Sequence, residues 1–343
     1  MPHNKAGMKS KKKSIIQFVI LLALGILLVW LAFSQVAGKK DEIISAFTNA
    51  NYFWVLVSTI IGFISHFLRA YRWNYLLEPL GHKTTLFNSN AAVFVCYFAN
   101  YGLPRMGEIS RCTIADRYDK VPFQVGFGTV VTERIIDSVL LLVIFFLTLV
   151  FQFTELGGLT DKYILSGLRA KSESLAQHPV TAIILAASFL FCFIVLFALR
   201  KKIMGKLKGK FGGIIKGFVE GLSSVRKMKN FGAFAGLSLL IWSAYFYSLY
   251  FCLKALPETS VINQSQCLTL MLFGTFGVVF TPGGLGAYHI IIAEILVFYG
   301  IEQVPAVAFP WLVWTSQFIL ITVLGIISLA ALPIVNKKKH VVS

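Results

Sequence analysis

The chain has 343 residues, of which 57% are hydrophobic and only 14% are charged, and its formal net charge is +17. Soluble domains carry roughly 25% charged residues, so this composition excludes an ordinary cytosolic enzyme, a disordered tail and a fibrous protein. A basic excess can indicate nucleic-acid binding, but the long apolar runs leave no room for a soluble basic fold. We therefore expect an integral membrane protein without a nucleic-acid partner.

Six apolar segments are long enough to cross a membrane, because a spanning helix needs about 20 mainly apolar residues. In chain order they are 14–36, 52–68, 123–151, 180–199, 231–253 and 305–333. The first follows a lysine-rich N-terminus and could be mistaken for a signal peptide. Its apolar core is too long for one, so we expect a retained helix.

Two further apolar stretches, 86–103 and 268–299, contain helix breaks. The first runs into residues 100–105 (NYGLPR), and the second is interrupted at 281–286 (TPGGLG). Proline lacks an N–H group and glycine is conformationally permissive, so the helices should unwind there. The predicted structural breaks are Asn100, Pro104 and Pro282.

The distribution of positive charge predicts how these segments cross the membrane. Lys and Arg cluster in 1–13, in 200–230 and in 336–343, and such clusters are retained in the cytoplasm. All three lie on one side only if both broken stretches enter and leave the membrane on the same side. We therefore predict an all-α polytopic protein with six full spans and two re-entrant hairpins, with eight spans as the alternative.

This topology implies one transmembrane domain over 14–335, with both termini on the cytoplasmic side of a bacterial-type inner membrane. The connection 200–230 has apolar residues at three- or four-residue steps and a glycine at every fourth position from Gly205 to Gly221. This pattern fits an amphipathic helix on the inner leaflet. Because so many glycines weaken a helix, a flexible basic loop is the alternative.

The residues around the two breaks are suited to binding an anion. Arg105 and Arg111 can each bind a phosphate through two parallel hydrogen bonds. Free N–H groups at Gly283, Gly284 and Gly286, at the start of a helix, would form an anion site. The alternative is that the prolines and glycines only kink helices and the arginines only mark a membrane boundary.

A third feature is the charged sequence Glu133-Arg134, followed by Asp137, within an apolar span. A charge at the centre of a membrane helix costs at least about 2.5 kcal/mol, so these side chains should face the bundle interior and find partners. They could line a polar groove and orient Arg105 or Arg111. The alternative is a self-neutralising structural ion pair.

Weaker candidates surround these features. Glu294 could carry a proton or pair with an arginine, and His289 precedes it on the same helix. Glu108 is a further ionisable candidate for the groove. The sequence 69–73 (RAYRW) is interpreted mainly as an interfacial belt with arginines extending toward water, although Arg72 could also reach a lipid phosphate.

No cofactor or metal site is predicted. The five cysteines lack C-x-x-C spacing and lie mostly in apolar runs, so we interpret them as buried apolar residues. The sequence contains no phosphate-binding loop of the G-x-x-x-x-G-K-[ST] type, which argues against direct use of ATP. A transporter is therefore favoured over an enzyme, although the sequence leaves this open.

Together these motifs resemble the transmembrane, flippase-like region of lysylphosphatidylglycerol synthases, over about residues 14–335. The matching residues are 69–73 (RAYRW), Asn100, Gly102, Pro104, Arg105, Gly107, Glu108, Arg111, Glu133, Arg134, Asp137 and 282–286 (PGGLG). The resemblance implies a polytopic unit with re-entrant helices that moves an aminoacylated phospholipid between leaflets. The family's cytosolic transferase domain has no counterpart in this sequence. His289 stands where many relatives have glutamate.

We therefore expect a protein that moves a lipid with a phosphate-bearing head group. Membrane phospholipids, anionic or aminoacylated, are the expected partners, and a separate cytosolic synthase is a further candidate. Arg105 and Arg111 would bind the head group, and the 283–286 turn would complete the pocket. The alternatives are a membrane-embedded transferase acting on a lipid-linked substrate and a non-catalytic scaffold that recruits a partner through 200–230.

Overall fold

A computed structural model of the chain describes residues 38–102, 106–151 and 228–337, together with a few isolated positions before residue 38 and Val225. The segment 1–13 and the predicted span 180–199 lie outside this part, as do most of the predicted span 14–36, of 200–230 and of the C-terminal tail. Pro104 and Arg105 also lie outside it.

Four helices in the described part are long and apolar enough to cross a membrane. They are α3 (Tyr52–Leu77), α6 (Phe123–Phe151), α10 (Phe231–Leu253) and α13 (Gln303–Lys337). They coincide with four of the six predicted spans, which confirms a helical membrane protein. The shorter elements are α2 (Lys40–Thr48), η1 (Glu78–Leu80), α4 (Leu86–Gly102), α5 (Met106–Asp119), η3 (Thr259–Val261), α11 (Gln264–Phe280), η4 (Pro282–Gly284) and α12 (Ala287–Phe298).

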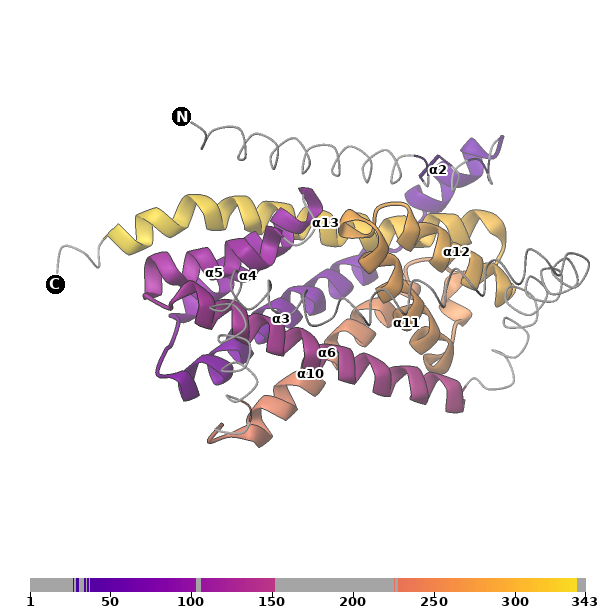
Figure 1. Ribbon diagram of the computed structural model, residues 1–343. Helices are drawn as coiled ribbons and strands as arrows, with labels where there is room; N and C mark the ends of the chain where they lie inside the picture. Colours follow the sequence, from indigo (N-terminus) through magenta and orange to yellow (C-terminus); the bar gives the residue numbers. More distant parts are fainter. Residues whose placement is uncertain are drawn as a thin grey trace, which may run out of the picture.

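The central pair is α3 and α10, which lie side by side over much of their length (Figure 1). The hydroxyl groups of Ser58 and Ser248 are 3.1 Å apart near one end, and Arg72 donates to Ser238 near the other. The two helices are therefore antiparallel. α3 continues nine residues beyond its predicted end at Leu68, because its arginines are paired inside the protein and no proline occurs before Pro79.

The first break separates two helices that pack as an antiparallel hairpin, α4 and α5. At the open end, Asn88 donates to Asp119 at 2.9 Å. At the tip, the Gly107 N–H donates to the Asn100 side chain at 2.9 Å. A Cβ at Gly107 would clash with the Cys96 carbonyl oxygen, so glycine is required for this close approach. Asn100 itself is still helical, and α4 ends two residues later, at Gly102.

The second break also joins an antiparallel pair, α11 and α12. Gly277 lies against the backbone of Tyr288, and Gly274 lies against Tyr288 and Ile292. The reversal takes place in the six residues 281–286, where Gly283, Gly284 and Gly286 have φ values of +59°, +81° and +82°. Only glycine adopts such angles readily, so the predicted break at Pro282 is confirmed.

The C-terminal helix α13 connects the two hairpins. It runs antiparallel to α4 (Figure 1): Asn336 and Asn88 exchange amide hydrogen bonds, Gly325 packs against Phe98, and Phe318 lies against Tyr101. It also packs against α12. Because one straight helix contacts both hairpins, it fixes where their tips lie relative to each other.

Four of the five cysteines, Cys96, Cys112, Cys252 and Cys267, are buried and free. This confirms their interpretation as buried apolar residues, and Cys192 lies outside the described residues. Within the described ranges, no group of three His, Cys, Asp or Glu side chains gathers as a metal site.

Candidate functional site

The acidic residues of α6 face α3, and the register of these helices decides what they meet. The Trp73 indole N–H donates to Thr129 Oγ1 at 3.0 Å, and Leu77 packs in the same cluster as Val121. Since α3 runs antiparallel to α6, residues earlier in α3 lie beside residues later in α6. Arg69 and Arg72 are thereby placed at the level of Glu133 and Asp137.

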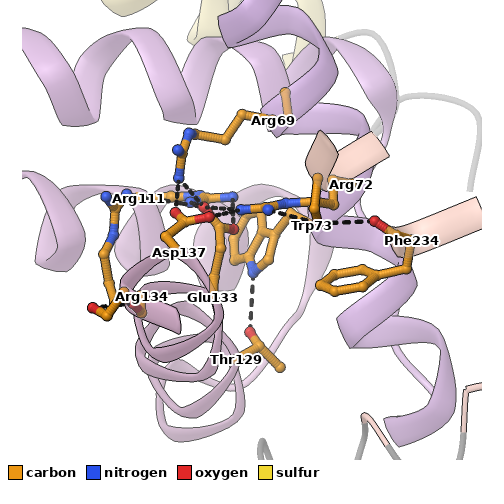
Figure 2. Close-up of polar contacts among 12 residues, drawn as sticks. Arg69, Arg72, Trp73, Arg111, Thr129, Glu133, Arg134, Asp137 and Phe234 are labelled. Atoms are coloured by element: carbon orange, nitrogen blue, oxygen red, sulfur yellow. Dashed lines mark hydrogen bonds and ion pairs between the residues drawn. The ribbon is translucent and has the colours of Figure 1, made fainter. Parts of the chain in front are cut away.

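Three arginines converge on these two carboxylates (Figure 2). Arg69 Nη1 lies 2.6 Å from Glu133 Oε1 and 2.7 Å from Asp137 Oδ2. Arg72 Nη2 lies 2.9 Å from Asp137 Oδ1. From α5, Arg111 Nη2 lies 3.1 Å from Glu133 Oε2. Every carboxylate oxygen of the pair therefore accepts a charge-assisted hydrogen bond, the strongest class in proteins.

Helix α10 completes the surroundings of the arginines. The Tyr245 hydroxyl accepts hydrogen bonds from Arg69 at 3.0 and 3.2 Å, and Ser238 Oγ accepts one from Arg72 at 2.9 Å. Arg111 lies over the Trp73 ring, with its guanidinium carbon 4.1 Å from the ring centroid. Cation–π contacts of this kind strengthen when the cation is desolvated. Residues from α3, α5, α6 and α10 thus contribute to one polar cluster.

Burial makes this cluster energetically demanding. The side chains of Arg69, Arg72, Arg111 and Glu133 are 3%, 0%, 1% and 0% exposed. Removing ions from water costs several kcal/mol for each, and the mutual attraction offsets this only where the geometry is good. Three buried arginines face two buried carboxylates, so this buried set carries a formal charge of +1. We call Arg69, Arg72, Arg111, Glu133, Arg134 and Asp137 the ion network.

The structure bears in two ways on the predicted roles of these residues. Glu133 and Asp137 face the bundle interior and find partners, as predicted, and Glu133 does hold Arg111. The interpretation of Arg69 and Arg72 as interfacial arginines extending toward water is wrong, because both are buried and paired with the acids of α6. A signal was present in the sequence, since the two acids of α6 exceed its single arginine and require positive partners from another helix.

Arg72 and Arg111 were predicted to bind a head-group phosphate. Their terminal nitrogens instead bond to Asp137, Ser238 and Glu133, and neither side chain is exposed. Arg134 differs, with a side chain that is 39% exposed. Glu108 lies one helical turn before Arg111 on α5 and is half-buried. Arg105, the remaining predicted phosphate ligand, lies outside the described residues.

Most of the N–H groups in the turn at 281–286 are bonded within the turn or to the helix that follows it. The Gly284 and Leu285 N–H groups donate within the turn, to Thr281 and Pro282, at 3.0 and 3.3 Å. The Gly286 N–H donates to His289 Nδ1 at 3.3 Å. Two of the three N–H groups predicted to bind an anion, those of Gly284 and Gly286, are therefore already hydrogen-bonded within residues 281–289.

His289 and Glu294 occupy different environments on α12. His289 is 1% exposed and its ring lies 3.8 Å from the Trp311 ring, centroid to centroid. Besides accepting the Gly286 hydrogen bond, it therefore packs as an aromatic residue in the core of the second hairpin. Glu294 is half-buried, five residues further along the helix.

The two breaks, 182 positions apart in the sequence when counted from Tyr101 to Gly283, meet in space. A Cβ on Gly283 would clash with the Tyr101 ring. The Tyr101 ring also packs edge-on against Trp314 and Phe318 of α13, with centroids 6.2 and 5.0 Å away. Trp314 in turn donates its indole N–H to the Gly283 carbonyl oxygen at 2.7 Å. The tips of the two hairpins are therefore in direct contact.

The tip of the first hairpin also connects this contact to the ion network. Asn100 and Tyr101 are adjacent in the chain, and Asn100 bonds to Gly107 at the start of α5. Arg111 follows Gly107 by one helical turn, about 6 Å along the helix. The contact between the hairpin tips therefore lies about one turn of α5 away from the ion network.

These features define a polytopic α-helical membrane protein with a buried arginine–carboxylate cluster and two broken hairpins. The family model described as "Lysylphosphatidylglycerol synthase TM region" matches residues 15–325, and the chain belongs to this family. The resemblance seen in the sequence motifs is thereby confirmed over nearly the whole chain.

Two curated proteins show partial similarity to the chain. The UPF0104 membrane protein MJ1595 of Methanocaldococcus jannaschii is 28% identical over 134 residues, which is 38% of this chain and 39% of that protein. The glycosyltransferase AglD of Haloferax volcanii is 26% identical over 121 residues, which is 34% of this chain and 19% of that protein. The chain thus matches well under half the length of either relative. No solved structure matches it significantly.

Proposed function

We propose that this protein moves a phospholipid, or another lipid with an anionic phosphate-bearing head group, between the leaflets of the membrane. The observation that carries the proposal is the ion network, which keeps an excess of positive charge inside a bundle of apolar helices. Family membership supports a function related to membrane lipids. A polar head group crossing the hydrocarbon region needs such a cluster, while its acyl chains can remain in the lipid.

The two hairpins would form the path as re-entrant elements. Helices α11 and α12 have 17 and 12 residues, and α4 and α5 have 17 and 14. At 1.5 Å per residue, α12 extends about 18 Å, short of a hydrocarbon core of about 30 Å. A hairpin that enters and leaves on one side fits these lengths better than two full crossings. Six spans and two re-entrant hairpins remain our preferred topology.

The test is reconstitution into liposomes that carry a head-group-labelled phospholipid, with a membrane-impermeant quencher to report leaflet exchange. We expect wild-type protein to accelerate exchange over protein-free liposomes and Arg105→Ala to slow it. Arg117→Ala, which removes an exposed arginine from α5, is the matched control and should match wild type. If wild type, Arg105→Ala and empty liposomes give identical exchange for several lipid classes, the proposal fails.

A second candidate is a membrane-embedded transferase acting on a lipid-linked substrate. The similarity to a protein named as a glycosyltransferase favours it, as does the buried Oε2 atom of Glu108, which has no hydrogen-bond partner among the described residues. Such a carboxylate could act as a base. Purified protein incubated with a lipid acceptor and an activated donor would then form product, and Glu108→Gln would abolish product formation.

A further inference from the structure

One arginine of the ion network differs from the other three in both exposure and pairing. The side chain of Arg134 is 39% exposed, whereas those of Arg69, Arg72 and Arg111 are at most 3% exposed. Its ion pair with Glu133, at 3.9 Å, is the longest of the network. Its Nε atom is buried and has no hydrogen-bond partner in the described part of the chain. Figure 2 shows Arg134 at the edge of the cluster.

The neighbouring carboxylates are already occupied. Glu133 accepts from Arg69 through Oε1 at 2.6 Å and from Arg111 through Oε2 at 3.1 Å. Asp137 accepts from Arg69 through Oδ2 and from Arg72 through Oδ1, at 2.7 and 2.9 Å. Each carboxylate is thus held by two other arginines at shorter distances, whereas the printed ion pair of Arg134, with Glu133, is 3.9 Å long.

The charge balance also calls for an anion. With Arg134 included, four arginines face Glu133 and Asp137, a formal excess of +2. Glu108 lies on the same side of α5 as Arg111, three residues before it, so its carboxylate belongs to the same region. Including Glu108 leaves an excess of +1. A single negative charge would neutralise this set, and an uncompensated charge at membrane depth is costly.

The surface beyond Arg134 is suited to lipid chains. Ser138, Leu142 and Phe146 follow Arg134 at steps of four residues, so they lie along one side of α6. Leu142 and Phe146 are 53% and 56% exposed. An anionic group bound at Arg134 would thus have an exposed apolar strip directly beside it. A free ion would not use this strip, whereas the acyl chains of a lipid would.

We propose that Arg134 is the residue that binds the ligand's anionic group, and that this group is a phosphodiester carrying one negative charge at the head of a lipid. The inference deepens the proposed function and rests on it for the nature of the ligand. Arg69, Arg72 and Arg111 are then positioning residues, which hold Glu133 and Asp137 and so leave Arg134 without a strong internal partner. The guanidinium group suits two phosphodiester oxygens.

The experiment measures lipid binding by native mass spectrometry of the full chain released from membranes into detergent. The probes are phosphatidylglycerol, a diacylglycerol with the same acyl chains but no phosphate, and inorganic phosphate. The variants are Arg134→Gln and Arg134→Lys, and Arg117→Gln is the control because it removes an exposed arginine from α5. Thermal unfolding of each variant establishes that it is folded.

We expect wild type to bind phosphatidylglycerol in preference to diacylglycerol. Arg134→Gln should weaken phosphatidylglycerol binding by about 10-fold, the value of one charge-assisted hydrogen bond. Arg134→Lys should restore part of it, and Arg117→Gln should change nothing. Inorganic phosphate should compete poorly, because it cannot use the apolar strip.

Equal phosphatidylglycerol affinities for wild type and Arg134→Gln would overturn the assignment of Arg134. Equal binding of diacylglycerol and phosphatidylglycerol to wild type would overturn the claim that the bound group is a phosphodiester. Strong competition by inorganic phosphate would show that the site binds a free anion and not a lipid. Leaflet exchange separates this inference from the proposed function. If wild type binds phosphatidylglycerol through Arg134 but does not accelerate exchange, the transport proposal fails and the binding site stands.

Discussion

The ion network and the 281–286 turn solve the same problem, polar groups inside a membrane bundle, in opposite ways. The network joins charged side chains from α3, α5 and α6, and α10 adds a hydrogen bond from Arg72 to Ser238. The turn is uncharged and closes its hydrogen bonds within six residues, assisted by His289 and Trp314. The network should therefore fail through loss of long-range ion pairs, and the turn through local steric conflict.

Among the substitutions considered, we expect the largest loss of unfolding free energy at Glu133. Glu133→Ala leaves Arg69 and Arg111 buried with fewer negative partners, which should lower the free energy of unfolding by about 3–5 kcal/mol. Denaturant unfolding in detergent measures this. Asp116→Ala removes an exposed acid from α5 and should have an effect below about 0.5 kcal/mol. Equal effects of the two substitutions would contradict the buried ion pairing.

A smaller effect is expected where the two hairpin tips meet. Gly283→Ala places a Cβ against the Tyr101 ring at a φ of +59°, which should cost about 1–3 kcal/mol of unfolding free energy. Gly232→Ala, where nothing lies within 4 Å of the added Cβ, is the control and should be neutral or slightly stabilising. Adding Tyr101→Ala should relieve part of the penalty, and strict additivity of the two changes would argue against the contact.

The hydrogen bond from the Trp314 indole to the turn should contribute less to the free energy of unfolding than the residues above. Trp314→Phe removes the 2.7 Å bond to the Gly283 carbonyl oxygen but retains a ring to stack on Phe318. The expected loss is about 1 kcal/mol, the net value of one hydrogen bond. Thermal unfolding would detect it as a small shift. An effect as large as that of Glu133→Ala would show that the turn depends on this bond more than its internal hydrogen bonds suggest.

The smallest effect is expected at an exposed pair outside both regions. Lys39 and Glu42 lie 3.7 Å apart, with side chains 52% and 60% exposed. Glu42→Gln should change the unfolding free energy by less than about 0.5 kcal/mol, because water and salt screen exposed pairs. The same denaturant titration measures it, and a loss above 1 kcal/mol would show that pairing outside the bundle matters as much as pairing within it.

Much of the local architecture could be predicted from the sequence. Apolar length placed the described spans, and Pro282 with its glycines placed the second break, because helix length and backbone restriction are local properties. Errors arose where a property depended on distant residues. The end of α3 was predicted too early, because arginines normally mark a membrane boundary and here they are paired inside.

The sequence by itself determined the class of protein, its family and the positions of the charged and broken segments, since hydropathy and short motifs are written along the chain. Only the tertiary structure decided which arginines are available to a ligand. The antiparallel packing of α3 against α6 assigns Arg69 and Arg72 to carboxylates, the α4–α5 hairpin brings Arg111 to Glu133, and Arg134 is left partly exposed. Which charges neutralise each other depends on the register between helices, and that register is set by packing across the whole bundle.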